Sequence, residues 1–391
     1  MISVNEALAH LLELASPLEA EMVPLAEAAG RVLARDVSAR RDQPPFSASA
    51  MDGYAVKGAE VELHAMFKVI GEAAAGHRFD GVVGAGQAVR IFTGAPIPEG
   101  AGFVVIQEDV TRKGNLITIT DEPGDGDNIR PRGGDFFDGE TVSAPRRLTP
   151  SDIALLAAMN IAEVPVTRRP DIALISTGDE LVMPGSTPGP DQIIASNTFG
   201  LKALLESLGA HVRILPIARD TIGSLTTAFS LTSGADLVVT IGGASVGDHD
   251  LVGEVAHNLG MERSFYKVAM RPGKPLMAGR MGQTAMVGLP GNPVSAMVCG
   301  HIFLEPMVRT MLGEKSIQPR RLEAPLAAPL AQNGPREHYM RAELQDDGQI
   351  RAFDRQDSSL LSVLAKANAL LIRPPHDPAR DANETVSYIR I

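Results

Sequence analysis

Hydrophobic and polar residues follow different patterns along successive parts of the chain. Near the N-terminus, apolar residues at positions 7, 8, 11, 12 and 15 recur with the spacing of one helix face, and Ser3 with Glu6 forms a capping box. A second short helix is expected around residues 24–33. Proline and glycine then separate short runs that are typical of strands, at 88–92, 103–110 and 116–120.

From residue 171 onward the pattern becomes that of an α/β domain. Continuous apolar runs indicate strands at 171–176, 213–218, 235–241, 275–279 and 284–289. Helical periodicity occupies the segments at 196–209, at 221–233, from about residue 250 and from Pro293. Alternating strands and helices of this length predict a parallel sheet with helices on both faces.

These changes of pattern divide the chain into three expected domains. Residues 1–170 are strand-rich and end with a helix whose start is indicated by Thr149, Pro150 and Asp152. The α/β domain covers residues 171–318, and a small β domain covers residues 319–391. We therefore expect a multidomain α/β protein with a central parallel-sheet domain.

Composition narrows the class of protein. The formal net charge is −11 at pH 7, whereas a general nucleic-acid-binding protein would carry a basic face. No segment has the pattern of a signal peptide or the apolar length of a membrane span. The single cysteine, Cys299, excludes an intrachain disulfide and a multi-cysteine zinc site. We expect a soluble, cytoplasmic protein with no nucleic-acid or membrane partner.

Three glycine-bearing loops follow predicted strands of the α/β domain, at residues 176–181, 241–250 and 288–293. Ligands of open parallel sheets bind at the carboxyl ends of the strands, and glycine allows a ligand to approach the backbone closely. Asn292 is a candidate N-cap before Pro293. A single loop of this kind is more often a simple turn, but three on one rim favour a binding site. None of the loops matches a dinucleotide or P-loop fingerprint.

Charged residues cluster in and after these loops. Asp179, Glu180, Asp248 and Asp250 would repel a phosphate unless a divalent cation such as Mg²⁺ lay between them. An equally open interpretation makes these acids solvated loop charges, with Asp248 capping the next helix. The cations Lys267, Arg271 and Lys274 follow in a loop stiffened by proline and glycine, and together the two sets suit an anionic ligand that carries a metal.

Seven motifs, in the family's order, resemble the molybdopterin molybdenumtransferases, the MoeA-type proteins that are similar to the E-domain of gephyrin. They are PPFSASAMDGYAV, IFTGAPIPEGA, GDEL, SNTFGLKALLESLGA, GGASVGDHD, KVAMRPGKP and GLPGNPVSA. The middle motifs alone also fit molybdopterin adenylyltransferases and a competence-damage family. The MDGYA and FTGAPIP segments favour the molybdenum-inserting branch.

The resemblance implies binding of adenylylated molybdopterin and molybdate, insertion of the metal into the dithiolene, and release of AMP with Mg²⁺ present. It implies a homodimer whose cleft lies between the middle domain of one subunit and N-terminal segments of the other. Other proteins of molybdenum cofactor biosynthesis are implied as partners. The implied fold has a three-layer, molybdopterin-binding middle domain and an elongated N-terminal region with a β-rich subdomain inserted at about residues 46–139.

Carried over motif by motif, and joined with the loop glycines, the resemblance gives a set of expected site residues. The expected catalytic residues are Asp52, Glu180 and Asp250. The expected ligand-binding residues are Thr93, Gly242, Gly243, Ser245, Gly247, Lys267, Arg271, Lys274, Pro290 and Asn292. The expected metal ligands are Asp52, Glu180, Asp220, Asp248 and Asp250. The family often has Asp where Ser47 stands, so Ser47 is left out of the site.

Two other functions stay open at this point. One is a non-catalytic scaffold that binds molybdopterin, and the other is a hydrolase of a different nucleotide. A gephyrin-like scaffold normally has extra domains, and acids at Asp52, Glu180 and Asp250 are unnecessary for docking alone. Cys299 lies in an apolar helical run, so we expect a buried hydrophobic residue rather than a nucleophile.

Overall fold

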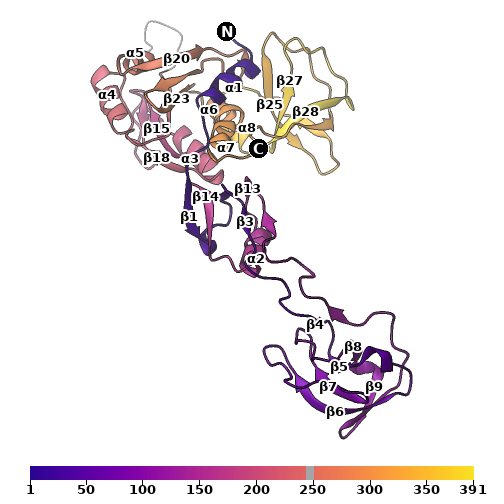
Figure 1. Cartoon of the computed structure of the whole chain (residues 1–391). Coiled ribbons are helices and arrows are strands. Elements are labelled where there is room, and N and C mark those ends of the chain that lie inside the picture. The colour runs from indigo at the N-terminus through magenta and orange to yellow at the C-terminus, as the bar shows by residue number, and fades with distance from the viewer. Residues whose placement is uncertain (244–250) are drawn as a thin grey trace.

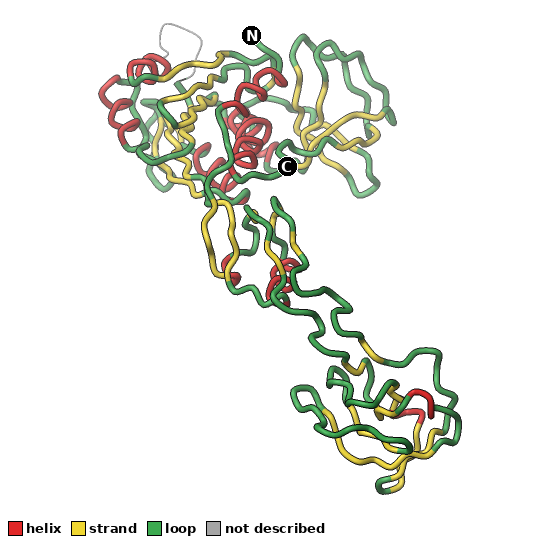
Figure 2. The backbone as a smooth tube through the Cα atoms, viewed as in Figure 1, coloured by secondary structure: helices red, strands yellow, loops and turns green. Residues whose placement is uncertain are grey.

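The computed structural model describes residues 1–243 and 251–391 and shows an elongated chain (Figure 1). The middle and C-terminal domains form a body at one end, and a slender stem leads to a small β domain, here called the tip (residues 46–130). Loops make up most of the connection between stem and tip (Figure 2). Four expected site residues, Ser245, Gly247, Asp248 and Asp250, lie outside the described residues. No helix in the described part of the chain is long and apolar enough to cross a membrane.

The middle domain is built on a six-stranded sheet. Its strands are β15 (Asp171–Ser176), β18 (His211–Ile214), β19 (Leu237–Ile241), β20 (Met261–Tyr266), β22 (Met277–Met281) and β23 (Thr284–Leu289). The order is β18-β15-β19-β23-β22-β20, and the first four strands are mutually parallel, as predicted. The reversed strand is β22, because a two-residue turn joins it to β23 and so tight a turn can only connect antiparallel neighbours.

Helices cover both faces of this sheet, which confirms the three-layer prediction (Figure 1). One face packs on α4 and α5 through residues such as Leu225 and Val252, and the other packs on α3, α6 and α7 through residues such as Leu201 and Met307. The helices are α3 (Asn197–Ser207), α4 (Ile222–Ser230), α5 (Leu251–Asn258), α6 (Pro293–Cys299) and α7 (Glu305–Met311), with a π-helical segment (Gly300–Leu304) between the last two.

The first helix, α1 (Val4–Glu13), also packs on the body, although it begins the chain. Its capping box is present as predicted, with the Glu6 N–H donating to the Ser3 hydroxyl and the Ser3 N–H donating to the Glu6 carboxylate. Its buried Leu8 and Leu11 join the core formed by α6 and α7. The second helix expected at 24–33 is present only as a 3₁₀ turn (Leu25–Glu27), because Gly30 has a φ of +74° and the chain turns there into a strand.

The stem is a four-stranded sheet, in the order β1-β14-β2-β13, packed on one helix. The helix α2 (Pro150–Ala158) begins as predicted, with Thr149 at the N-cap, Pro150 in the first turn and Asp152 completing a capping box. The other elements are β1 (Ala20–Pro24), a 3₁₀ turn (Leu25–Glu27), β2 (Val32–Leu33), β3 (Val37–Ser38), β12 (Thr141–Val142), β13 (Arg146–Arg147) and β14 (Glu163–Thr167).

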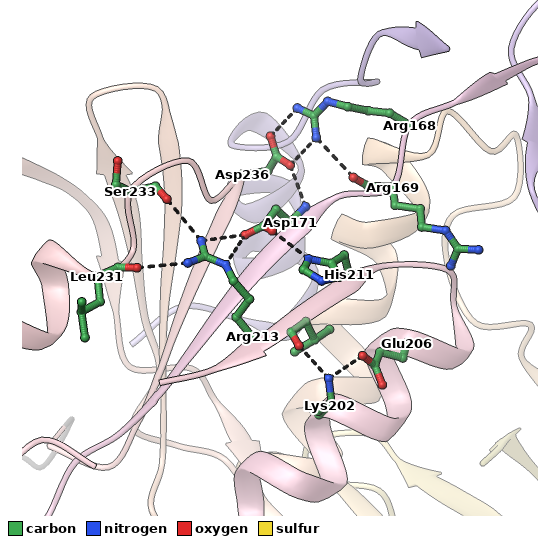
Figure 3. Close-up of polar contacts among 11 residues, drawn as sticks. Arg168, Arg169, Asp171, Lys202, Glu206, His211, Arg213, Leu231, Ser233 and Asp236 are labelled. Carbon is green, nitrogen blue, oxygen red and sulfur yellow. Dashed lines mark hydrogen bonds and ion pairs between the residues drawn. The ribbon is translucent and has the colours of Figure 1, made fainter. Parts of the chain in front are cut away.

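An arginine at the junction ties the stem to the body (Figure 3). Both terminal nitrogens of Arg168 donate to the carboxylate of Asp236, each at 2.7 Å, and its Nε donates to Glu19 at the start of β1. Asp236 also accepts the N–H of Asp171 at 2.8 Å. The stem is therefore attached at the amino ends of β15 and β19, on the edge opposite their carboxyl ends.

The tip is an open sheet in the order β8-β5-β7-β6-β10-β9, with apolar side chains such as Val56 and Ile91 packed on its two faces. Its elements are β4 (Ala48–Ser49), β5 (Gly53–Val56), a 3₁₀ turn (Gly58–Glu60), β6 (Met66–Ala73), β7 (Gln87–Ile91), β8 (Phe103–Ile106), a second 3₁₀ turn (Gln107–Asp109), β9 (Val110–Lys113), β10 (Leu116–Ile119) and β11 (Ile129–Arg130).

The C-terminal domain is a β-sheet that includes one strand from the middle of the chain. The order is β21-β25-β27-β28-β24, and β21 (Met270–Arg271) pairs in parallel with β25. The basic loop after β20 is thereby fixed to the C-terminal sheet. The other elements are β24 (Leu322–Pro325), β25 (Glu337–Leu344), β26 (Ile350–Ala352), α8 (Leu361–Leu364), β27 (Ala369–Arg373) and β28 (Thr385–Arg390).

Candidate functional site

A pocket of about 580 Å³ opens at the carboxyl ends of β15, β19 and β23. The three loops that the sequence placed on one rim all line it, since parallel strands bring their carboxyl ends to the same edge. The lining residues from these loops include Thr177, Gly178, Glu180, Gly242, Gly243, Pro290, Gly291 and Asn292.

Glycine is required at three places in these loops. Gly178 has a φ of +149°, and a Cβ there would lie 2.5 Å from the Glu180 carboxylate. A Cβ on Gly242 would lie 2.6 Å from the Thr177 carbonyl oxygen, and one on Gly243 would lie 2.3 Å from Val252. The Gly242 N–H donates to the carbonyl of Leu289. Glycine is therefore required at residue 242 by packing within the protein, and its N–H is not a free donor for a ligand.

Two exposed carboxylates, Glu180 and Asp220, line the pocket, and a third acid lies beside them. The Asp220 N–H donates to Asp179 Oδ1 at 3.3 Å. Desolvation, followed by the negative charges of Asp179 and Glu180, raises the pKa of Asp220. Carboxylates that repel one another in this way supply the oxygen ligands that Mg²⁺ takes. Among the described residues, however, no three or more His, Cys, Asp or Glu side chains form a complete metal site.

One wall of the pocket is apolar. The short strands β16 (Leu181–Val182) and β17 (Ile193–Ile194) pair in parallel beside the opening, and Leu181, Ile193 and Ile194 line it. Ile193 is 57% exposed, which is unusual for a residue of its kind. An apolar wall of this kind suits the face of a planar ring.

The C-terminal domain closes another side of the pocket through residues 357–359. The Asn292 Nδ2 donates to the Ser358 hydroxyl at 3.1 Å, and the Val294 N–H donates to the Ser358 carbonyl at 3.0 Å. Ser359 lines the pocket, and its N–H and hydroxyl donate to Asp357. Asn292 is the N-cap residue of α6, as predicted, but its side chain makes no capping hydrogen bond.

The three expected cations lie on a hairpin-like loop whose ends are joined by backbone hydrogen bonds. The Lys267 N–H donates to the Leu276 carbonyl, and the Val268 N–H donates to the Lys274 carbonyl. Lys274 is exposed and precedes Pro275, which lines the pocket. Arg271, on β21, lies instead beside His338 in the parallel backbone pairing of β21 with β25 of the C-terminal sheet. The loop thus reaches from the pocket to the C-terminal domain.

A buried arginine that sequence reasoning missed lies on that sheet. Arg341 is fully buried, and its Nη2 donates to the carbonyl of Asp357 at 3.1 Å. Its Nε and Nη1 have no hydrogen-bond partner in the described part of the chain, and the same holds for Nε2 of buried His338. Burial, followed by the charge of Arg271, lowers the pKa of Arg341 to about 10. Burial and the neighbouring arginines lower the pKa of His338 to about 3, so His338 is neutral at pH 7.

Unpaired guanidinium nitrogens inside a protein are costly, and an oxyanion would satisfy them. No sequence signal indicated this group, because His338 and Arg341 are three residues apart on β25 and therefore lie on opposite faces of the strand.

Asp52 and Thr93 lie together, but in the tip. The backbone N–H and the hydroxyl of Thr93 both donate to Asp52 Oδ1, each at 2.8 Å. These two bonds, led by the N–H, lower the pKa of Asp52. Figure 1 shows the tip at the far end of the molecule from the middle domain, whose strands β15, β19 and β23 carry the pocket. Within one chain, Asp52 and Glu180 therefore lie in different domains, at opposite ends of the molecule.

Cys299 is fully buried in α6, and burial raises the pKa of its thiol, so it is a core residue without nucleophilic character.

Comparison with known proteins extends over the whole chain. Family models match residues 2–160 (MoeA N-terminal region, domains I and II), 173–310 (probable molybdopterin binding domain) and 323–391 (MoeA C-terminal region, domain IV). A molybdopterin molybdenumtransferase of Haemophilus influenzae is 36% identical over 99% of this chain and 98% of its own length. The chain belongs to the MoeA family.

Other MoeA relatives agree with this assignment. A molybdopterin molybdenumtransferase of a Nostoc species is 35% identical over 93% of this chain and 86% of its own length. The crystal structure of a molybdopterin biosynthesis MoeA protein from Pyrococcus horikoshii superposes with a TM-score of 0.86 at 26% identity, covering all of both chains. The multidomain fold expected from the sequence is thus a MoeA fold.

Proposed function

We propose that this protein transfers molybdenum from molybdate into adenylylated molybdopterin and releases AMP, acting as a cytoplasmic homodimer with Mg²⁺. The observation that carries the proposal is the pocket itself. Its rim combines glycine-bearing loops, two carboxylates and an apolar wall. On its C-terminal side, Asp357 connects it to the buried Arg341, whose Nε and Nη1 have no hydrogen-bond partner among the described residues. The names of the MoeA relatives fit this combination.

Each part of the pocket suits one part of the substrates. The wall of Leu181 and Ile193 offers an apolar face to a pterin or adenine ring, and the loops that bear Gly178 and Gly243 line the part of the pocket proposed for the phosphates. Lys267, Arg271, Lys274 and Arg341 supply positive charge and hydrogen-bond donors for molybdate and for the pterin phosphate. No nucleophilic side chain is needed, because the two sulfurs that receive the metal belong to the substrate.

The carboxylates suit Mg²⁺. Glu180 and Asp220 would hold it together with Asp52 of the partner subunit, and Asp248 and Asp250 are further candidates outside the described residues. When bound, the ion would neutralise negative charge on the pyrophosphate of the substrate. The ionised state of Asp52, which Thr93 favours, suits this role.

The separation of Asp52 from Glu180 supports the homodimer. A two-fold pairing of elongated chains can bring the tip of one subunit to the pocket of the other, so that each of two sites takes residues from both chains. Mixing two inactive variants, D52N and E180Q, tests this arrangement. Mixed dimers would have one intact site, so activity should return to roughly a quarter of the wild-type value. Mixtures that stay inactive would exclude a shared site.

The activity is tested with purified protein, adenylylated molybdopterin, Mg²⁺ and molybdate. The proposal expects AMP release that depends on molybdate and that falls by orders of magnitude in D52N, E180Q and D250A, with E62Q on the tip surface as a control. Binding without AMP release would indicate a scaffold. AMP release at the same rate without molybdate would indicate a nucleotide hydrolase. Either result would contradict the proposed transfer.

A further inference from the structure

An arginine beside Asp52 is held by two aromatic rings. Arg90, on β7, lies opposite Tyr54 of β5 in the antiparallel ladder that includes Gly53. Its Cζ lies 5.1 Å from the centre of the Tyr54 ring and 4.7 Å from that of Phe92. Both distances fall within the range of favourable cation–π contacts. The half-buried guanidinium therefore has a fixed place in the tip.

Its hydrogen bonds hold the backbone at and directly after Asp52. Arg90 Nη1 donates to the carbonyl of Gly53 at 3.0 Å, and Nη2 donates to Gln107 Oε1 at 2.6 Å. The Gln107 N–H donates in turn to the carbonyl of Asp52 at 3.0 Å. One guanidinium thus holds the carbonyl of the residue that follows Asp52, and also the side chain of Gln107, whose N–H binds the Asp52 carbonyl.

The same side chain also anchors the segment that binds the Asp52 carboxylate. Phe92, which stacks on Arg90, immediately precedes Thr93, whose N–H and hydroxyl donate to Asp52 Oδ1. β5 also packs closely on β8 at this point, because a Cβ on Gly53 would lie 2.0 Å from the Val105 carbonyl oxygen. Arg90 therefore contacts both the segment that bears Asp52 and the segment that bears Thr93, the hydrogen-bond donor to the Asp52 carboxylate.

We propose that Arg90 is a positioning residue, which holds the Asp52 carboxylate in the orientation in which it takes part in molybdenum transfer. The inference rests on the proposed function in so far as Asp52 acts in that reaction. Electrostatics point the same way, since the positive charge of Arg90 adds to the Thr93 hydrogen bonds in lowering the pKa of Asp52.

Two substitutions separate the charge of Arg90 from its geometry. R90Q removes the charge and the planar fork. R90K keeps a charge but has neither the fork nor the flat face that stacks on two rings. We expect R90Q to lower kcat for AMP release by about 10- to 100-fold, the usual cost of losing a residue that orients a ligand-bearing side chain. R90K should keep the Asp52 pKa near its wild-type value and still lose most of that activity.

Two measurements are made on the full-length protein. Steady-state kinetics gives kcat and KM for AMP release, and NMR titration of ¹³C-carboxyl-labelled aspartate, assigned with D52N, gives the Asp52 pKa without substrate or metal. R112Q is the matched control, because Arg112 Nε donates to the Gly114 carbonyl in the hairpin between β9 and β10. Thermal unfolding of each variant checks that the tip remains folded.

The results distinguish this inference from the proposed function. A higher Asp52 pKa in R90Q, with kcat reduced in R90Q and R90K but not in R112Q, supports the inference. Wild-type kcat in R90K would overturn it, since charge alone would then suffice, and so would wild-type kcat in R90Q when D52N is inactive. Normal turnover by D52N would instead contradict the role proposed for Asp52 itself.

Discussion

Asn292 and Ser358 join the middle and C-terminal domains at the edge of the pocket, with Asn292 Nδ2 donating to Ser358 Oγ at 3.1 Å. The neighbouring Val294 N–H donates to the Ser358 carbonyl, so a side-chain contact and a backbone contact lie side by side. The C-terminal domain therefore shapes the pocket directly, through residues 357–359.

The variant S358A tests how much the pocket depends on that contact. It removes the hydrogen bond that holds the Asn292 side chain at the pocket and leaves the backbone bond in place, so we expect AMP to bind about fivefold more weakly, the factor that corresponds to about 1 kcal/mol of lost preorganisation. Isothermal titration with AMP measures the change, and S362A on α8 is the control. An unchanged dissociation constant would show that the pocket does not need this contact.

The raised pKa of Asp220, caused by desolvation and then by the charges of Asp179 and Glu180, predicts a stability effect that depends on pH. Because folding raises the pKa of Asp220, ionisation of this group costs stability as the pH rises through the folded pKa, and the cost is absent below its ordinary value of 3.8. D220N should therefore unfold at a higher temperature than wild type at pH 7 without divalent ions. The difference should shrink toward pH 4.

Thermal unfolding between pH 4 and pH 8 gives this difference directly, with D125N in an exposed loop of the tip as the control. The same D220N protein should lose Mg²⁺-dependent AMP release, since the residue that costs stability is the one proposed to hold the ion. Equal melting temperatures for D220N and wild type at pH 7 would contradict a raised pKa of Asp220 in the folded protein.

The two hydrogen bonds from Arg168 to the Asp236 carboxylate should hold the angle between the stem and the body. Asp236 is 16% exposed and Arg168 is 30% exposed, so R168A should cost about 1–3 kcal/mol, between the values for surface and buried ion pairs. We expect small-angle scattering of R168A to show a wider range of particle dimensions. R169A, at the next position, is the control, and identical scattering curves would exclude a role of these two bonds in setting the angle.

Gly53 should be essential for the stability of the tip. In G53A the new Cβ would meet a backbone oxygen that cannot move away without separating β5 from β8, so the cost should exceed the usual 1–3 kcal/mol of overpacking. Hydrogen exchange should become faster in the tip and stay unchanged in the body. G58A is the matched control, because its Cβ would meet its nearest neighbour at an ordinary 3.5 Å.

Local signals were the most informative part of the sequence. Ser3 with Glu6 and Thr149 with Asp152 correctly placed two helix starts, because a capping box is complete within four residues. The three rim loops could be grouped before the fold was known, because parallel strands bring their carboxyl ends to one edge. Gly30 shows the opposite case, where a turn set by tertiary hydrogen bonding to Leu148 replaced an expected helix.

The parts of the site that the sequence did not reveal depend on contacts between domains. Ser358 and Ser359 reach the pocket only because the C-terminal sheet docks on α6, and no local pattern describes that docking. The same is true of Arg341, whose free nitrogens become significant only once the side chain is known to be buried. Motif comparison found Asp52 without indicating that it would lie at the opposite end of the chain from Glu180.

The pairing of β21 with β25 means that the body cannot be divided at the covalent boundary between its domains. A chimera that exchanged only residues 319–391 with those of a relative would receive a foreign sheet but keep its own edge strand. Its Arg271 and the new counterpart of His338 would then have to match in register and in charge. Exchange of the basic loop together with the C-terminal residues would preserve that match, so the two segments are expected to diverge as one unit.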